Sequence, residues 1–306
     1  MGWRSLEEFI LALEQRGELL RVSHPVDVEL EAGCIADLLV KRNGPAVIFD
    51  QPRLGDGSIS RYPLAMNLFG TRDRTNLALG VVEPKEIGEM MTGLMKPDIG
   101  GILRRPWTGL GLLKQGISMA PRRVSRGKCQ QVRMENPDVT RLPIPTSWPQ
   151  DGGPFMTLPL VVTSDPETGV HNLGMYRSQV FGPDEVGLHW QKHKHGADHA
   201  EASDDRMPVA ICLGGPPQVI FSAISPLPDN LSEYEFAGLL SGRRLKITKC
   251  LTNDLWVPAD CDFVIEGYTL PSERRMEGPF GDHFGHYSLE DEYPVMHVTA
   301  ITHRKD

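Results

Sequence analysis

The amino-acid sequence predicts an α/β domain followed by a mostly β domain. Helical and strand-like segments alternate over about the first 95 residues, which is typical of a small α/β unit. Residues 97–128 then break into Gly, Pro and basic residues without sustained periodicity, as linkers between domains do. Short apolar and β-branched runs follow and indicate strands. We therefore predict an N-terminal α/β domain with its linker over 1–125 and a mostly β domain, expected to be a barrel, over 126–306.

The N-terminal domain begins with an amphipathic helix. Ser5 and Glu8 have the spacing of a capping box, and Phe9, Ile10 and Leu13 then fall on one helical face. Gly17 is the expected stop of this helix. The remaining elements of the domain are predicted as strands over 19–22, 46–50 and 63–70 and helices over 28–41 and 84–94.

The second domain is expected to be dominated by strands. One helix is predicted over 233–240, ended by Gly242, and the polar segment 184–202 has no assignment. The strands are predicted over 130–134, 158–163, 209–212, 219–223, 245–250, 263–266 and 295–302.

Composition excludes several classes of protein. None of the windows of about 20 residues is apolar enough to span a bilayer, and the N-terminus lacks the pattern of a signal peptide, so a cytoplasmic location is expected. The net charge of −8 argues against a broad nucleic-acid surface, and the basic stretch 104–128 is interpreted as a solvated linker face. The five cysteines are widely spaced without a Cys-x-x-Cys pair, which favours reduced thiols over disulfides or a structural zinc.

A segment rich in histidine follows the first strands of the second domain. It reads His171 to Arg177 and then, after a polar turn, His189 to His195. Imidazole and amide oxygen suit an ion such as Mn²⁺ if a carboxylate joins them from elsewhere in the fold. A His-rich surface strand and loop is the alternative interpretation. Arg177, Lys192 and Lys194 carry charge that suits a flavin phosphate, whereas the absence of a Gly-x-Gly-x-x-Gly turn argues against a Rossmann dinucleotide site.

Three carboxylates stand out. Glu233 follows Ser232 in the first turn of the predicted helix, where a simple capping role is the default interpretation. Glu277 and Asp282 bracket Gly-Pro-Phe-Gly, a tight loop that can present both acids to one cavity. Two nearby carboxyl groups can divide the roles of base and proton donor. The alternatives are a surface turn with solvated acids and a local cluster of Asp282 with His283 and His286.

Several segments together resemble the UbiD family of decarboxylases that use a prenylated flavin, in the family's order and approximate spacing. These segments are Gly152-Gly153-Pro154-Phe155, Asp165 to Gly169, Asn172 to Arg177, Ser225-Pro226 to Glu233, Thr252 to Leu255 with Val257-Pro258, and Glu277 to Asp282. The resemblance covers nearly the whole chain. It implies that the β domain is a split barrel that binds prenylated FMN.

The resemblance also implies roles for particular residues. Arg177 is expected to pair with Glu277 and orient the substrate carboxylate, and Asp282 is expected to deliver a proton to the carbon that lost CO₂. Asn172, Glu233 and His193, with His195 as the competing third ligand, would hold a Mn²⁺ that anchors the flavin phosphate, with K⁺ alongside. The residues expected to contact the cofactor are Asn172, Met175, Tyr176, Arg177, His189, Trp190, Gln191, Lys194 and Glu233.

The function implied by the resemblance is reversible, non-oxidative decarboxylation of an aromatic or α,β-unsaturated acid. A small carboxylic acid would be the substrate, and a flavin prenyltransferase would supply the cofactor. Family members are longer, so a C-terminal oligomerisation domain is expected to be absent from this chain, and the full-length protein is expected to be a homo-oligomer. The alternatives are an inactive cofactor-binding fragment or accessory subunit, and a flavin-dependent oxidoreductase on a split barrel.

Overall fold

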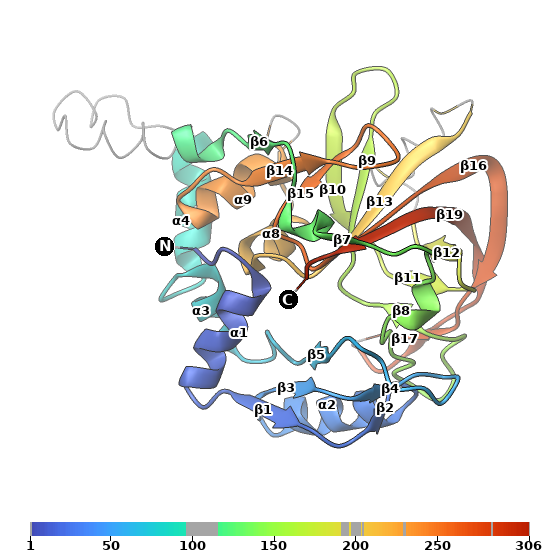
Figure 1. Cartoon of the computed structure of the whole chain (residues 1–306). Helices are drawn as coiled ribbons and strands as arrows, with labels where there is room; N and C mark the ends of the chain where they lie inside the picture. Colours follow the sequence, from blue (N-terminus) through green and yellow to red (C-terminus); the bar gives the residue numbers. More distant parts are fainter. Residues whose placement is uncertain are drawn as a thin grey trace, which may run out of the picture.

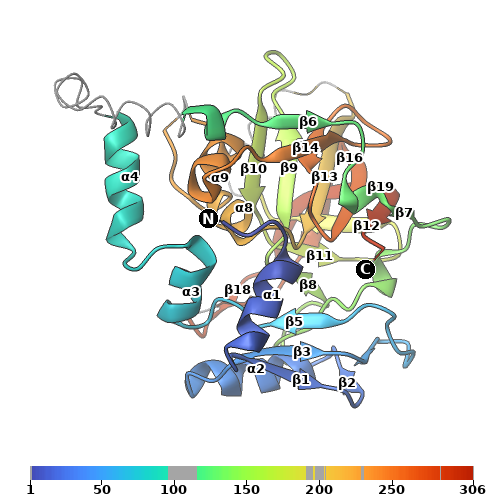
Figure 2. The same cartoon turned by 60° about the vertical axis from the view of Figure 1, so that its left-hand side comes forward.

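An N-terminal α/β unit lies against a strongly curled, mostly β unit (Figure 1). The computed structural model describes residues 2–95, 116–190, 196, 203, 205–228, 231–282 and 284–305. In both views the layer formed by β1 to β5 and α2 lies below the large sheet, while α3 and α4 stand to one side of it (Figures 1 and 2). The predicted fold class is confirmed. Most of the linker prediction, residues 96–115, lies outside the described residues.

The N-terminal unit is built on a small sheet in the order β1-β3-β5, with β1 parallel to β3 and β3 antiparallel to β5. Its elements are α1 Leu6–Gln15, β1 Leu19–Val22, β2 Val26–Asp27, α2 Glu31–Lys41, β3 Ala46–Phe49, β4 Pro52–Arg53, β5 Leu64–Met66, α3 Arg72–Leu79 and α4 Lys85–Met95. The strand expected over 63–70 is shorter than predicted, and α3 was not predicted.

The first helix begins as predicted, although its capping differs in one respect. The Ser5 hydroxyl accepts the amide of Glu8 at 3.2 Å, and Phe9 and Leu13 are fully buried on the expected face. The Glu8 carboxylate, however, accepts the amide of Arg4 at 2.5 Å and not that of Ser5. The reciprocal half of the predicted capping box is therefore displaced by one residue, because the Glu8 side chain reaches the amide of the residue that precedes Ser5.

The β unit is a large antiparallel sheet in the order β10-β9-β13-β16-β19-β12-β11-β8, with β7 paired to β19. Its strands are β7 Val132–Arg133, β8 Phe155–Met156, β9 Leu160–Ser164, β10 His171–Met175, β11 Ser178–Val180, β12 Glu185–Leu188, β13 Met207–Leu213, β16 Phe263–Glu277 and β19 Asp291–His303. A hairpin of β17 Phe280–Gly281 and β18 Tyr287–Ser288 connects β16 to β19.

The strand β16 is much longer than the predicted 263–266. It continues through the mostly exposed residues Ser272 to Met276 because β19 pairs with it as far as Glu277. Register shifts after Glu266 and Thr269 interrupt the alternation of side chains along the strand. Because this half of the strand is polar and its side chains do not alternate regularly, hydrophobic periodicity in the sequence does not predict it. The extension matters because it carries Glu277 to the far end of the sheet.

A smaller sheet and two helices complete the β unit. The sheet has the order β15-β14-β6, formed by β6 Arg122–Val124, β14 Lys246–Lys249 and β15 Trp256–Pro258. The predicted strand over 219–223 is wrong, because this run belongs to the helix α8, Pro217–Ser222. Pro217 suits a first helical turn, and a short run buried on all sides has no period that separates helix from strand.

The second helix, α9, spans Glu233–Ser241 and ends at Gly242 in the left-handed conformation, as predicted. The chain's N-terminus packs against this helix. The Gly2 amide donates to the carbonyl of Ser241 at 3.1 Å, and Arg243 returns a hydrogen bond to the Gly2 carbonyl at 2.7 Å. The two units are therefore joined by backbone contacts as well as by the shared apolar core of α1 with the sheet.

A buried carboxyl group stabilises the loop before β15. Glu266 is fully buried on β16, and its side chain accepts the amides of Leu251 and Thr252 at 2.8 and 2.6 Å. It also accepts the Thr252 hydroxyl at 2.7 Å. These contacts explain the position of the Thr252 to Leu255 motif at this point of the fold. None of the described helices is long and apolar enough to cross a membrane.

Replacement of Glu266 by Ala should destabilise the protein by about 3 kcal/mol, because it leaves buried amide and hydroxyl donors without an acceptor. Urea unfolding followed by circular dichroism measures this loss. The matched control is Glu273→Ala, on the same strand but partly exposed, which should cost less than about 1 kcal/mol. Equal losses in the two variants would contradict the role given to Glu266.

Candidate active site

An arginine and a glutamate from distant parts of the chain form an ion pair at one end of the large sheet. Arg177 Nε lies 2.9 Å from Glu277 Oε1, and Nη2 lies 3.2 Å from Oε2. Glu277 is fully buried, and the Arg177 side chain is 14% exposed. Burial strengthens the attraction between the two charges, whereas the loss of their hydration opposes pairing. The net stability of the ion pair therefore depends on the geometry of its two parallel hydrogen bonds.

Neighbouring strand ends bring these residues together. Arg177 directly precedes β11, His189 directly follows β12, and Ser178 is paired with Leu188. The His189 amide donates to the Arg177 carbonyl at 3.2 Å, which extends the pairing by one residue. Residues opposite each other on antiparallel strands share a face of the sheet. Arg177 and His189 therefore reach toward the same point, where β16 ends at Glu277.

His189 is a second partner of Glu277. Its Nδ1 lies 2.7 Å from Glu277 Oε2, and its ring packs on Tyr293 of β19 with centroids 4.2 Å apart. Burial alone would raise the pKa of Glu277, but hydrogen bonds from His189 and Arg177, with the Arg177 charge, leave the pKa lowered. The carboxyl group is thus held in its ionised form.

The loop after Glu277 is fixed by the segment around Gly152. Gln179 donates to the Gly152 carbonyl at 2.8 Å and accepts the Gly278 amide at 2.9 Å. The Gly152 amide donates to the Pro279 carbonyl at 2.8 Å. A Cβ on Gly152 would lie 2.0 Å from the Gly278 oxygen, and Gly278 has a φ of 101°, so both positions require glycine.

Asp151 and two aromatic rings support the same loop. Asp151 accepts the Gly281 amide through Oδ1 at 2.8 Å and the Trp148 amide through Oδ2 at 2.9 Å. Phe280 packs against Phe155 with ring centroids 4.7 Å apart, and the Arg177 guanidinium lies over the Phe280 ring at 4.6 Å. The motif Gly152 to Phe155 is therefore structural support for the run Glu277 to Asp282.

Asp282 lies on the hairpin turn that follows β17 and is partly buried. Its Oδ1 accepts the amides of Phe284 and His286 at 2.8 and 3.1 Å, and its own amide donates to the His286 carbonyl at 2.8 Å. The local cluster of Asp282 with His286, one of the alternatives from the sequence, therefore exists, but it uses the backbone of His286. His283 lies outside the described residues. The two acids differ sharply in environment, because Glu277 is sealed off from solvent and Asp282 is not.

Asn172 lies on β10, at the opposite edge of the sheet, and Glu233 reaches the backbone next to it. Asn172 is buried on β10, and the adjacent Leu173 amide donates to Glu233 Oε2 at 3.3 Å. Ser232 and Glu235 form the capping box of α9, so Glu233 is not its capping carboxylate. Amide and carboxylate oxygens are donors that suit Mn²⁺. The residues fit such an ion, although the predicted third ligand His193 and its competitor His195 lie outside the described residues.

The other predicted cofactor contacts are only partly described. Met175 ends β10, Tyr176 follows it, and both are partly buried, while Trp190 is 4% exposed. Gln191, Lys192 and Lys194 lie outside the described residues. Within the described part of the chain, no cluster of three or more His, Cys, Asp or Glu side chains is arranged to hold a metal.

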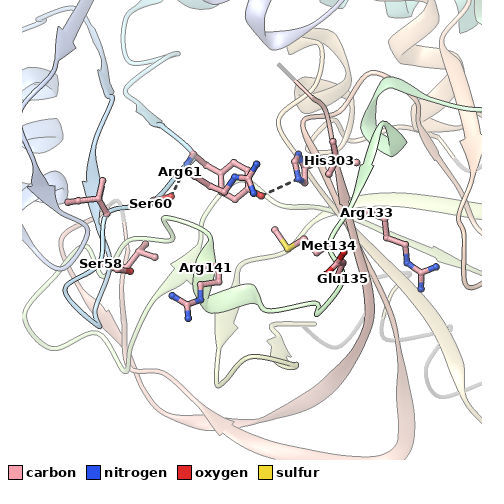
Figure 3. Close-up of a pocket in the computed structure, with 12 residues that line it drawn as sticks. Ser58, Ser60, Arg61, Arg133, Met134, Glu135, Arg141 and His303 are labelled. Carbon is pink, nitrogen blue, oxygen red and sulfur yellow. Dashed lines mark hydrogen bonds between the residues drawn. The ribbon is translucent and has the colours of Figure 1, made fainter.

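Two pockets lie away from the ion pair. One, of about 530 Å³, lies between the loop 54–62 and the strands β7 and β19, where Tyr62 contacts His303 (Figure 3). It contains none of the predicted site residues. The other, of about 410 Å³, is lined by His171 and Ser232, the sequence neighbours of Asn172 and Glu233. Asn172 and Glu233 themselves do not line this pocket.

Comparison with known proteins identifies the family. Residues 10–92 match the 3-octaprenyl-4-hydroxybenzoate carboxy-lyase N-terminal domain, and residues 122–306 match the 3-octaprenyl-4-hydroxybenzoate carboxy-lyase Rift-related domain. The chain therefore belongs to the UbiD family. An uncharacterized protein of Archaeoglobus fulgidus is 43% identical over 310 residues, which cover 100% of this chain and 63% of that protein.

Solved structures of UbiD-class enzymes share the fold. An evolved dimeric form of HmfF from Pelotomaculum thermopropionicum, in complex with prFMN, matches 99% of this chain with a TM-score of 0.84 and 28% identity. Vanillic acid decarboxylase of Sedimentibacter hydroxybenzoicus, in its closed form, matches 100% with a TM-score of 0.85 and 30% identity. The chain spans 66% and 63% of those two proteins.

Sequence patterns missed much of what surrounds Glu277. His189 was expected at the cofactor, and its contact with Glu277 was not predicted. Gln179, Asp151 and Tyr293 carried no signal of their own, because each acts through a partner about 90 or more residues away or across a sheet. Only the glycine pairs at 152–153 and in the 277–282 run marked the place where two segments approach closely.

The lowered pKa of Glu277 predicts a pH-dependent contribution to stability. The ordinary value is 4.5, and the folded value lies below it, so the stabilisation is complete above about pH 4.5 and is lost as pH falls through the folded pKa. The unfolding free-energy difference between wild type and Glu277→Gln should therefore shrink in acid. Urea unfolding at a series of pH values measures it. A difference that does not change with pH would contradict an ionised, stabilised Glu277.

Proposed function

We propose that this chain carries the cofactor site and catalytic residues of a carboxy-lyase that reversibly decarboxylates an aromatic or α,β-unsaturated acid with prenylated FMN. The observation that carries the proposal is the fully buried Glu277, bound by Arg177 and His189 next to the loop that holds Asp282. Membership of the UbiD family and the solved complex of HmfF with prFMN support it.

Arg177 retains donors for a substrate carboxylate. Its Nε and Nη2 donate to Glu277, and Nη2 also donates to the Ser288 hydroxyl at 2.9 Å. A guanidinium has five N–H groups. The two on Nη1 have no hydrogen-bond partner within the described part of the chain. We assign these donors to the substrate carboxylate, which a rigid guanidinium orients better than a flexible ammonium would.

The two acids then have different tasks. Glu277 stays ionised, fixes the guanidinium plane and excludes water around it, because it is fully buried. Asp282 is the proton donor to the carbon that lost CO₂. Its Oδ1 accepts the amides of Phe284 and His286, which position the carboxyl group on the loop.

Asn172 and Glu233, together with His193, are the proposed ligands of a Mn²⁺ that anchors the flavin phosphate, with K⁺ nearby. When bound, prenylated FMN supplies the electron sink for decarboxylation. The residues proposed to line it are Met175, Tyr176, Arg177, His189, Trp190, Gln191 and Lys194. A flavin prenyltransferase is the proposed source of the cofactor, and a homo-oligomer is the proposed assembly.

A second candidate is a cofactor-binding polypeptide without turnover of its own. The chain spans about two thirds of the length of the enzymes that it resembles. Both candidates predict flavin binding, and they differ in the release of CO₂.

Production of the chain together with a flavin prenyltransferase and Mn²⁺ allows a direct test. We expect CO₂ release from at least one member of a panel of aromatic and α,β-unsaturated acids. Glu277→Gln should reduce kcat by at least about 100-fold because Arg177 loses its anionic partner, while the flavin absorption spectrum is retained.

Gln150→Ala, in the same region, is the matched control and should retain activity, because within the described residues Gln150 is hydrogen-bonded through its backbone amide and not through its side chain. Unchanged turnover in the Glu277 variant would remove Glu277 from the mechanism. A flavin-loaded wild-type protein that releases no CO₂ from any acid would favour the second candidate.

The proposed metal ligands are tested by metal content. Glu233→Ala should lower Mn²⁺ affinity by about tenfold or more, measured as manganese per protein by mass spectrometry after dialysis. The matched control is Glu235→Ala, which changes a carboxylate two residues away that caps α9. Equal manganese retention in the two variants would exclude Glu233 as a ligand.

A further inference from the structure

His189 donates a hydrogen bond to Glu277 that adds to the two from Arg177. A carboxylate offers about four acceptor positions, and Arg177 occupies one on each oxygen. The shortest contact of the buried carboxyl group is with His189 Nδ1, at 2.7 Å from Oε2. An ionised carboxylate only accepts hydrogen bonds, so Nδ1 must carry the proton in this contact.

Contacts other than the hydrogen bond to Glu277 also fix the orientation of the His189 ring. The backbone amide donates to the Arg177 carbonyl, and the ring packs against Tyr293 at 4.2 Å between centroids. The side chain is 15% exposed. Backbone pairing on one side and an aromatic ring on the other hold Nδ1 toward Glu277, so little rotamer freedom remains to be lost.

We propose that His189 is a positioning residue of this site, which donates from Nδ1 to Glu277 and thereby fixes the carboxylate plane against Arg177. This role is additional to the flavin contact expected from the sequence. The effect of His189 on turnover rests on the proposed function, whereas its effect on the protonation of Glu277 does not.

The charged and titratable groups around Glu277 define the expected pH effect. Arg177 faces it from the start of β11 and His189 from the end of β12, while Asp291 is its register partner on β19. Tyr293 also faces it from β19, and burial, with Glu277 and Asp291 nearby, raises the pKa of this phenol. Arg177 and His189 favour the ionised form of Glu277, and burial and Asp291 oppose it. Loss of the His189 donor must therefore raise the pKa of Glu277.

A pair of amide variants tests the position of the donor. The side-chain nitrogen of His189→Asn lies where Nδ1 lies in the imidazole, whereas that of His189→Gln lies nearer the place of Nε2. The protonation of Glu277 is followed by isotope-edited infrared spectroscopy against pH, with Glu277→Gln as the spectral reference. In His189→Asn we expect the Glu277 carboxylate to titrate close to its wild-type pH. In His189→Gln we expect the Glu277 carboxylate to bind its proton about tenfold more tightly than in the wild type.

His297→Gln is the matched control, because His297 makes a contact of the same length with Glu273 on the β16 and β19 hairpin, outside the site. It should leave the titration of Glu277 unchanged. Identical titrations of Glu277 in the Asn and Gln variants, or in His189→Gln and wild type, would overturn the proposal. Circular dichroism establishes that each variant is folded.

The activity measurement separates this inference from the proposed function. With an active enzyme, the acid limb of kcat/KM should move to higher pH in His189→Gln and stay near wild type in His189→Asn. An acid limb that is the same in both variants would overturn the positioning role. If the wild type releases no CO₂ at all, the proposed function fails, and the infrared titration alone decides the role of His189.

Discussion

The ionisation of one buried carboxyl group constrains the rest of the site. Glu277 has no exposed surface, so its charge is tolerated only because Arg177 and His189 supply hydrogen bonds in place of water. Those donors must come from separate strands that end at the same point. The lengths and register of β11, β12 and β16 are therefore tied to the position of this single side chain.

A second set of contacts keeps the acid loop in place. Gln179 and the Gly152 backbone fix Gly278 and Pro279, and Asp151 holds Gly281. Each of these bonds involves a backbone group of the loop, so the loop is fixed without using the side chains of Glu277 or Asp282. The loop is thus part of the rigid framework, although it is irregular in secondary structure, and this rigidity is what preorganisation of a catalytic site requires.

Local signals predicted the elements that depend on local contacts. The helix α9 was predicted over 233–240 because Ser232 is a suitable cap at its start and Gly242 a suitable end, and the structure shows Ser232 capping it and Gly242 in the left-handed conformation. The strand predicted over 219–223 is wrong for the opposite reason. A buried apolar run has no periodicity that separates helix from strand, and packing beside α9 decided that this run forms the helix α8. The length of β16 also depended on a distant partner, since β19 pairs with its exposed polar half.

The sequence by itself determined the order of α/β and β segments and the unusual loop from Glu277 to Asp282, because capping residues, hydrophobic runs and glycine pairs act on their near neighbours. The resemblance of several motifs added the expectation that Arg177 and Glu277 act together. Only the tertiary structure decided that the two side chains form parallel hydrogen bonds in a buried place and that His189 joins them. Such contacts join residues about 90 to 100 positions apart, and they depend on strand register, which no local pattern specifies.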